Sequence, residues 1–238
     1  MEKILVPGGR LELNEIISDK TKKANTYLSQ IYDIDEKEKK VSIAMPYKEG
    51  RLVVLSMGMS FDAFFYSKTR LYHSRVTIVD RYKSNNLYVL VVELKTPLNK
   101  VQRRQFFRYE VSMPVSYMLM DNDAITVYEK TGELPDSMTE GRLTEGQTID
   151  ISGGGLKFAG THIEKGSMVY IQLFYMLGSA LYCLRTAASV VESVNPPGRR
   201  DVFHNRVSFE NVKSDDRELF IRFIFEEERK QRQNERGK

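Results

Sequence analysis

Two short clusters of residues have the chemistry needed to hold a nucleotide. Arg104 and Arg108 lie four positions apart beside phenylalanines, and a guanidinium fork pairs with phosphate or with the O6 and N7 acceptors of guanine. Asp150 can accept hydrogen bonds from guanine N1–H and N2–H, and Ser152 can donate or accept. Glycines, which permit positive φ and close backbone approach, follow directly at Gly153, Gly154 and Gly155. These clusters therefore predict two halves of one nucleotide site.

Each cluster taken alone has an ordinary explanation. Basic clusters are usually solvated faces, and Asp-Ser-Gly stretches are common turn chemistry. The two phenylalanines between the arginines, Phe106 and Phe107, indicate that this segment enters a strand and anchors in a core. The order of the clusters and their strand-rich surroundings make the combination specific.

Residues 102–108 (QRRQFFR) and 150–155 (DISGGG) resemble the RxxxR and (D/N)xSxxG signatures of PilZ domains, receptors for the bacterial messenger cyclic di-GMP. The resemblance covers residues 101–225, and both signatures are intact. The preceding part of the chain resembles the small β domain of flagellar brake proteins of the YcgR/MotI type, through its layout and through residues 8–11 and 57–59. Membership of this family implies a ligand-binding module without catalysis.

The resemblance also implies roles for individual residues toward cyclic di-GMP, bound as a monomer or a stacked dimer. Arg104 and Arg108 would contact phosphates and guanine Hoogsteen edges. Asp150 and Ser152 would hold a guanine where the glycines leave room. Four further candidates are Arg103, which would stack on a base, Gln102 beside it, and Lys157 and Arg206, which strand pairing places near the motif.

By the same resemblance, the protein is expected to be a cytoplasmic effector that slows flagellar motility. Ligand would order residues 97–108 and reorient the N-terminal domain. The ligand-bound protein would then engage the flagellar stator, or the rotor through its switch protein, at the basal body. An alternative is a cyclic di-GMP-responsive adaptor that regulates another machine, such as exopolysaccharide synthesis.

Composition allows one large or two small domains with packed cores, because the 238 residues are 41% hydrophobic. A net charge of +4 is too weak to indicate a nucleic acid polymer as partner. The single cysteine, Cys183, cannot form an internal disulfide, which suits a reducing cytoplasm, and we expect it to be a buried strand residue.

Neither a targeting signal nor a membrane span is predicted. The apolar run at the N-terminus is too short for a signal peptide. Residues 169–184 are mostly apolar, but Gly178 and Ser179 interrupt them, so we expect a buried β-hairpin and no membrane insertion.

Catalytic and metal-binding patterns are missing from the sequence. The three histidines, His73, His162 and His204, are scattered, and no HExxH, CxxC, Walker or GxGxxG pattern occurs in its required context. Acidic residues between positions 121 and 148 match no calcium-loop spacing. We therefore expect neither an enzyme nor a cofactor other than the ligand.

Short segments rich in Val, Ile, Tyr and Phe, separated by Gly, Ser and Asn, run through the chain. We expect a mainly all-β fold of two small β-barrel domains in tandem, followed by a C-terminal α-helix. Expected strands of the first domain cover residues 26–33, 40–45, 51–57, 63–68, 71–81 and 86–94.

Pro97 marks the expected domain boundary, because proline cannot donate to a sheet and biases Thr96 toward an extended form. The expected divisions are an N-terminal barrel at 1–96, a linker with the arginine motif at 97–108, a PilZ domain at 101–225 and a charged tail at 226–238.

In the second domain, residues 107–120 are expected to be extended, and residues 121–148 to be a polar loop with one short strand at 125–128. Further barrel strands are expected at 155–159, 168–177, 180–194 and 201–209. Ser214 is expected to cap a helix whose apolar face carries Phe220 and Phe223. From Glu226 onward we expect the charged chain to continue the helix into solvent, to fray and to end in disorder.

Overall fold

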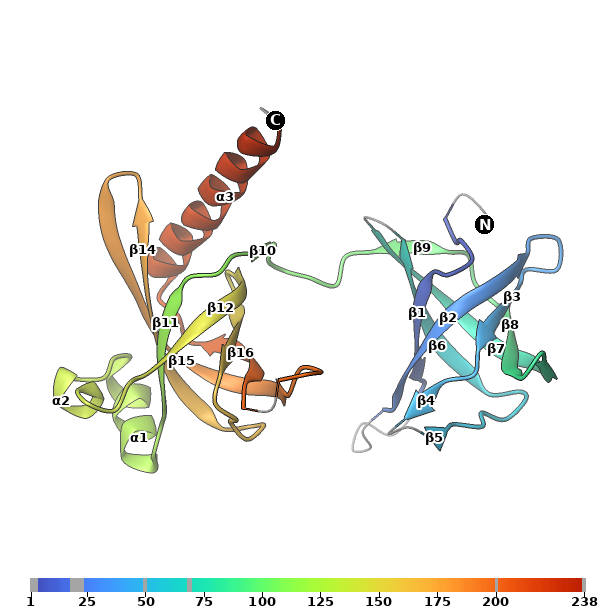
Figure 1. The fold of residues 1–238 in the computed structure, drawn as a ribbon, viewed down its shortest axis with the longest axis horizontal. Coiled ribbons are helices and arrows are strands. Elements are labelled where there is room, and N and C mark those ends of the chain that lie inside the picture. The colour runs from blue at the N-terminus through green and yellow to red at the C-terminus, as the bar shows by residue number, and fades with distance from the viewer. Residues whose placement is uncertain (1–3, 18–23, 49–50, 68–69, 200, 237–238) are drawn as a thin grey trace. The chain divides into compact units, whose positions relative to one another are not determined.

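The computed structural model describes residues 4–17, 24–48, 51–67, 70–199 and 201–236. The chain divides into two compact units, Met1–Arg103 and Arg104–Lys238. Each unit is a closed barrel of six antiparallel strands with one further strand added at its side (Figure 1). This confirms the prediction of a mainly all-β protein with two barrels in tandem.

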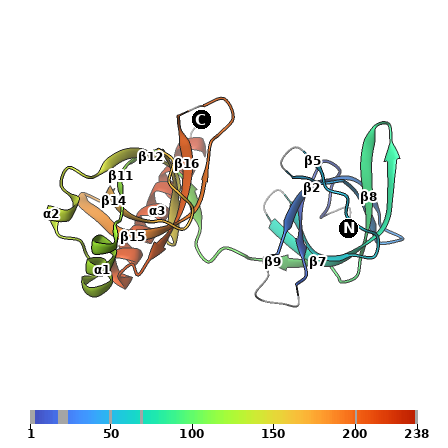
Figure 2. The same cartoon turned by 90° about the horizontal axis from the view of Figure 1, so that it is seen from below.

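In the N-terminal unit, the barrel strands follow the order β6-β1-β2-β3-β8-β7, and pairing of β6 with β7 closes the ring. Figure 2 shows this ring nearly end-on. Alternate residues of each strand point inward, so Leu11, Ile43 and Phe65 are fully buried in one core. The barrel strands are β1 (Arg10–Glu15), β2 (Thr26–Asp35), β3 (Lys40–Ala44), β6 (Ser60–Ser67), β7 (Arg70–Ser84) and β8 (Leu87–Leu94).

One strand prediction for this unit was wrong, and one strand was not predicted. The strand expected at 51–57 is only β5 (Arg51–Leu52), paired with β4 (Tyr47–Lys48), because the chain then turns at Gly58, whose φ is 80°. The sequence analysis missed β1, although its alternation of leucine with polar residues was a signal for a strand with one buried face.

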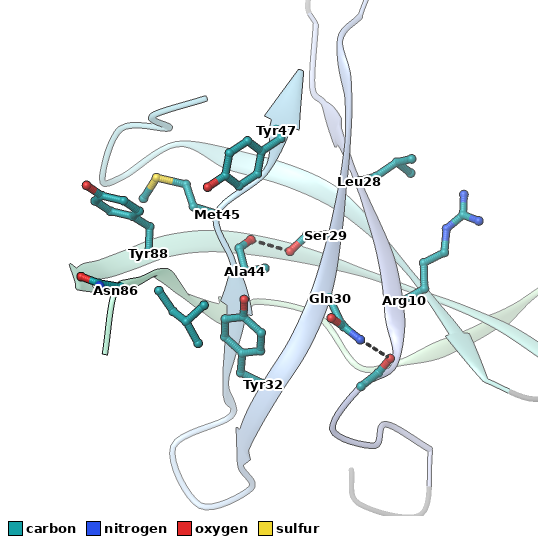
Figure 3. A pocket seen from close by; sticks show the side chains of 12 residues that line it. Arg10, Leu28, Ser29, Gln30, Tyr32, Ala44, Met45, Tyr47, Asn86 and Tyr88 are labelled. Atoms are coloured by element: carbon teal, nitrogen blue, oxygen red, sulfur yellow. Dashed lines mark hydrogen bonds between the residues drawn. The ribbon is translucent and has the colours of Figure 1, made fainter. Parts of the chain in front are cut away.

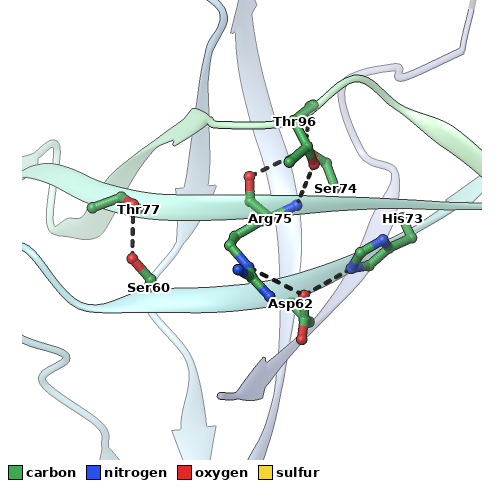
Figure 4. Close-up of polar contacts among 7 residues, drawn as sticks. All are labelled: Ser60, Asp62, His73, Ser74, Arg75, Thr77 and Thr96. Atoms are coloured by element: carbon green, nitrogen blue, oxygen red, sulfur yellow. Dashed lines mark hydrogen bonds and ion pairs between the residues drawn. The ribbon is translucent and has the colours of Figure 1, made fainter.

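The segment expected to be a linker is partly a strand. β9 (Asn99–Val101) pairs with β7, with Val101 opposite Leu71. Just before it, Ser74 Oγ donates to the carbonyl of Thr96 at 2.7 Å, and Arg75 N–H donates to the Thr96 hydroxyl at 2.9 Å (Figure 4). Pro97 therefore shapes a turn within the first unit, and the boundary between the units lies later, at Arg103 and Arg104.

In the C-terminal unit, the barrel order is β12-β11-β14-β15-β16-β13, closed by pairing of β12 with β13, and β10 adds to β12. The core includes Ile151, Phe158, Ile171 and Leu173, all fully buried. The strands are β10 (Arg108–Glu110), β11 (Pro114–Leu119), β12 (Thr144–Ser152), β13 (Gly155–Gly160), β14 (Met168–Leu177), β15 (Ala180–Val194) and β16 (Phe203–Glu210).

The polar region 121–148 is largely helical, and the short strand expected at 125–128 was wrong. α1 (Asn122–Thr131) begins after Asp121, whose carboxylate accepts from Ala124 N–H at 2.8 Å, and it ends at Gly132 with φ 75°. Ala124 and Tyr128, one turn apart, are buried in a second apolar cluster with Tyr170. α2 (Asp136–Thr139) follows, and then β12 starts at Thr144, four residues before the predicted end of the loop.

The C-terminal helix continues into the charged tail, as expected. α3 (Ser214–Arg236) packs Phe220 and Phe223 on Tyr175 of β14, with ring centroids 5.4 and 4.9 Å apart (Figure 1). Beyond residue 226 it stays helical, with ion pairs Glu227–Lys230 and Glu228–Arg232 along its exposed side. The helix extends to Arg236, and no fraying is seen up to that residue.

The apolar stretch 169–184 forms the predicted hairpin, in which β14 and β15 pair up to Leu177 and Ala180 around Gly178. Cys183 in β15 is half-buried, less covered than expected. Across the residues that the structure describes, no helix has both the length and the apolar character needed to cross a membrane.

Candidate nucleotide-binding site

Strand pairing brings the two sequence motifs together where the C-terminal barrel closes. Arg108 in β10 lies opposite Ser152 in β12, and Asp150 in β12 lies opposite Lys157 in β13. Lys157 in turn lies opposite Arg206 in β16. Paired residues of neighbouring antiparallel strands project on the same face.

That face is the outer one. Ile151, Leu156 and Val207, which alternate with these positions, are buried in the barrel core. Asp150, Lys157 and Arg206 therefore form one row across three strands on the outside. Arg108 and Ser152 form the start of the neighbouring row.

Positive charge is concentrated around this face. Burial, with Arg104 and Arg206 as neighbouring cations, lowers the pKa of Arg108 below its usual value, and the nearby Asp150 carboxylate opposes this only in part. Burial, Lys157 and Arg199 likewise lower the pKa of His204. Cations that destabilise one another in this way favour the arrival of an anion.

Arg206 has a protein partner, Glu192 of β15, at 3.3 Å. Both side chains are more than two-fifths exposed, and exposed ion pairs of this kind contribute little to stability. Glu192 is therefore only a weak competitor for an anion that binds Arg206.

The serine and glycine residues of the second motif are engaged in local structure. Ser152 Oγ donates to the carbonyl of Gly155 at 2.9 Å and accepts from Gly154 N–H at 3.4 Å, which stabilises the turn between β12 and β13. Gly155 has φ 158°, and a Cβ there would lie 2.1 Å from the carbonyl oxygen of Val207. Close pairing of β13 with β16 thus requires glycine at 155.

Gly153 and Gly154 differ from the sequence expectation. Of the three glycines, only Gly155 has a positive φ. Gly153 and Gly154 face the ring of Phe106, which would lie 2.7 and 2.8 Å from a Cβ at these two positions. In this structure the space beside them is occupied by a residue of the arginine motif itself.

The arginine motif is divided between the two units. Arg103 belongs to the N-terminal unit, where its guanidinium donates to Glu12 Oε2 at 3.0 Å and to the Tyr66 hydroxyl, and lies 4.6 Å from the centre of the Phe64 ring. Hydrogen bonds and charge from Glu12 raise the pKa of Arg103 against the opposing effect of burial. The base-stacking role implied by resemblance would require release from this clamp.

Gln102 is an exposed residue just after β9, and Arg104 is the exposed first residue of the C-terminal unit. Sequence analysis did not find Glu12, Phe64 and Tyr66 as partners of the motif. Glu12 lies 91 positions before Arg103, and no local pattern connects residues so far apart. Arg217 of α3, whose guanidinium lies 5.7 Å from the centre of the Phe106 ring, was also missed.

A separate hollow of about 520 Å³ lies on the N-terminal barrel between β2 and the β4 segment (Figure 3). Its walls are mainly apolar and aromatic, with Tyr32, Tyr47 and Tyr88 around Met45. Gln30 and Ser29 already donate to backbone carbonyls, those of Gly8 and Ala44. With Arg10 as its single charged residue, this hollow lacks the paired cations of the motif face.

Histidine and acidic side chains make isolated contacts. His73 lies 2.9 Å from Asp62, and His162 lies 3.0 Å from Ser193. Within the described ranges, no group of three or more His, Cys, Asp or Glu side chains is arranged to hold a metal ion.

Two family models match this chain. A family model described as PilZ domain matches residues 102–226, and one described as Flagellar protein YcgR matches residues 6–94. No curated protein sequence matches the chain.

Two solved structures share the fold. The structure of the Bacillus subtilis inhibitor of motility (MotI/DgrA) matches with a TM-score of 0.72 and 16% identity, over 96% of this chain and 100% of that one. Escherichia coli YcgR in complex with c-di-GMP matches with a TM-score of 0.52 and 15% identity, over 97% of this chain and 88% of that one. The chain therefore belongs to the PilZ domain family, with an N-terminal domain of the YcgR type.

Proposed function

We propose that this protein is a cyclic di-GMP receptor whose ligand binds on the outer face of the C-terminal barrel. The observation that carries the proposal is the convergence of Arg104 and Arg108 with the row Asp150, Lys157 and Arg206. The ligand identity is supported by the PilZ family match and by the c-di-GMP complex of YcgR, which has the same fold.

The chemistry of this face fits a guanine dinucleotide. Arginine forks can pair with both phosphates or with the Hoogsteen edge of guanine, and Asp150 can accept from guanine N1–H and N2–H. Lys157 and Arg206 add positive charge along the same row. Ligand would relieve the repulsion that lowers the pKa of Arg108.

We further propose that ligand binding makes the protein inhibit flagellar motility in the cytoplasm by engaging the stator or the switch at the basal body. Two findings support a motility role: the YcgR model matches residues 6–94, and a structure with the same fold is an inhibitor of motility. Residues 102–107, which connect β9 to β10, carry the arginine motif. A ligand gripping this connection would alter the attachment of one unit to the other.

Titration calorimetry of the purified protein with cyclic di-GMP tests the receptor proposal, with cyclic di-AMP and GTP as controls. Selective binding of cyclic di-GMP is expected, and the stoichiometry distinguishes one ligand from a stacked pair. Equal binding of all three nucleotides, or binding of none, would contradict the proposal.

The motility proposal is tested by affinity capture from cells with raised cyclic di-GMP, followed by identification of the captured proteins. Stator or switch proteins are expected, together with slower swimming when the protein is overproduced. Capture of exopolysaccharide synthase subunits in their place, with unchanged swimming, would replace the motility role by regulation of that machine.

A further inference from the structure

Phe106 connects the two signature motifs directly. It lies between the arginines in sequence, and its half-buried ring faces Gly153 and Gly154 at the turn between β12 and β13. At Gly154, the three atoms nearest to an added Cβ all belong to Phe106, the closest at 2.8 Å. A methyl group there would collide with the ring, because real Cβ contacts are longer.

The C-terminal helix completes the seat of this ring. A Cβ on Gly153 would lie 2.7 Å from Phe106 and 2.8 Å from the side chain of Ile221 in α3, so the two side chains meet over this glycine. Arg217, one turn earlier in α3, places its guanidinium 5.7 Å from the centre of the Phe106 ring. Phe106 is thus held by two glycines, an isoleucine and a cation.

Arg217, which contacts the Phe106 ring, makes an unfavourable contribution to the stability of this packing. Its Nε is buried and has no hydrogen-bond partner among the described residues. A buried donor without a partner is unfavourable unless another interaction compensates. The nearby Phe106 ring offers its negative face to the guanidinium and supplies such an interaction.

The neighbouring Phe107 provides a useful contrast. Its ring is 44% exposed and stacks on Phe225 of α3 at 5.9 Å. Phe107 therefore touches the same helix at a more open position, and it is not among the side chains nearest to Gly153 and Gly154.

We infer that Phe106 is a positioning residue, and that Gly153 and Gly154 are glycines in order to seat its ring rather than to admit the ligand. The inference rests on the proposed cyclic di-GMP site. When the Phe106 ring is packed against these glycines, the segment is held at a point between Arg104 and Arg108. A ligand then has less conformational entropy to remove from this segment. The glycines of the second motif then contribute to ligand binding partly by holding the arginine motif in place.

A double-mutant cycle between Gly154→Ala and Phe106→Ala tests this inference. In wild type, Gly154→Ala is expected to weaken cyclic di-GMP binding about tenfold, a typical coupling between contacting residues, and to lower the unfolding temperature measured without ligand. In the Phe106→Ala background, adding Gly154→Ala should change affinity and unfolding temperature little, because the ring that it strikes is gone.

The opposite pattern would overturn the inference. If the glycine serves the ligand, Gly154→Ala will weaken binding equally with or without the Phe106 ring and leave ligand-free unfolding unchanged. Phe107→Ala is the matched control, and it should not suppress the effect of Gly154→Ala. Phe106→Leu keeps an apolar side chain in the seat and should bind more tightly than Phe106→Ala.

The cycle also separates this inference from the proposed function. If wild type binds no cyclic di-GMP, the receptor proposal fails, but the unfolding temperatures of the four proteins still show whether Phe106 and Gly154 are coupled. If the changes in unfolding temperature of the two single variants add up to that of the double variant, the proposed packing of Phe106 on Gly154 is rejected.

Discussion

The two barrels share one architecture but differ in the charged neighbours of the arginines beside their added strands. Each closes six strands and adds a seventh at its side. In the N-terminal barrel, arginines beside the added strand have acidic partners. Arg103 is paired with Glu12, and Arg75 lies 3.8 Å from Asp62, which also lies 2.9 Å from His73 (Figure 4). In the C-terminal barrel, burial and the neighbouring cations Arg104 and Arg206 lower the pKa of Arg108.

This difference shows that the barrel itself does not define the site. A fold supports many functions, and binding depends on the residues placed on it. Here the placement is made at the seam where β10, β12, β13 and β16 adjoin. In the N-terminal seam, beside β9, Arg103 is paired with Glu12. In the C-terminal seam, Arg108 has Arg104 and Arg206 as neighbouring cations, although Arg206 is also paired with Glu192.

Removing the cations of the C-terminal seam should have the largest effect. Arg104→Ala and Arg108→Ala are each expected to weaken cyclic di-GMP binding by about 10- to 100-fold, because a hydrogen bond to a charged group contributes roughly 1.5–3 kcal/mol. Calorimetry measures the loss, and circular dichroism checks the fold.

Arg142→Ala is the matched control, since Arg142 is a partly exposed arginine of the same unit, paired with Asp121 at 2.7 Å. It should bind cyclic di-GMP like wild type. If the two motif variants also bind like wild type, the charge difference between the barrels has no part in recognition.

Disturbing the backbone of the C-terminal seam should have the second-largest effect. Gly155→Ala places a Cβ 2.1 Å from the Val207 carbonyl oxygen, and we expect a loss of roughly 1–3 kcal/mol in the free energy of unfolding, typical of overpacking. Urea denaturation measures it. Ser152→Ala removes one hydrogen bond in the same turn and should cost about 1 kcal/mol. An unchanged free energy of unfolding in Gly155→Ala would argue against the close approach at Gly155.

Releasing the paired arginine of the N-terminal seam should have a smaller effect in the opposite direction. Glu12→Gln removes the charge that holds Arg103, and we expect cyclic di-GMP to bind about two- to fivefold more tightly, the scale of a partly exposed ion pair. Adding Arg103→Ala should abolish this gain. Unchanged affinity in Glu12→Gln would mean that the ligand does not recruit Arg103.

The smallest predicted effect concerns pH. Because burial, Lys157 and Arg199 lower the pKa of His204 in the folded state, the unfolded state binds the proton more readily. Stability from this group is therefore present above the usual histidine pKa and is lost as the pH falls below it. An anionic ligand near Lys157 should raise the pKa of His204, which an NMR titration with and without cyclic di-GMP measures. A further fall would contradict the proposed placement.

Much of the fold could be predicted because its signals are local. The β14–β15 hairpin follows from two apolar runs around Gly178 and Ser179. The prediction failed where local signals conflicted: acidic residues in 121–148 indicated a loop, although Asp121 and Gly132 cap a helix whose Ala124 and Tyr128 share a buried face. There, packing on the barrel decided the outcome.

The sequence by itself determined the residue types of the site, the two signatures, the strand alternation and the helix that ends the chain. Tertiary structure alone decided which of these residues meet. Strand register aligns Asp150 with Lys157 and Arg206, a contact across 91 positions assigns Arg103 to Glu12, and the turn at Gly153 and Gly154 seats Phe106. Propensity acts over a few neighbouring residues, whereas pairing and packing join residues far apart in the chain.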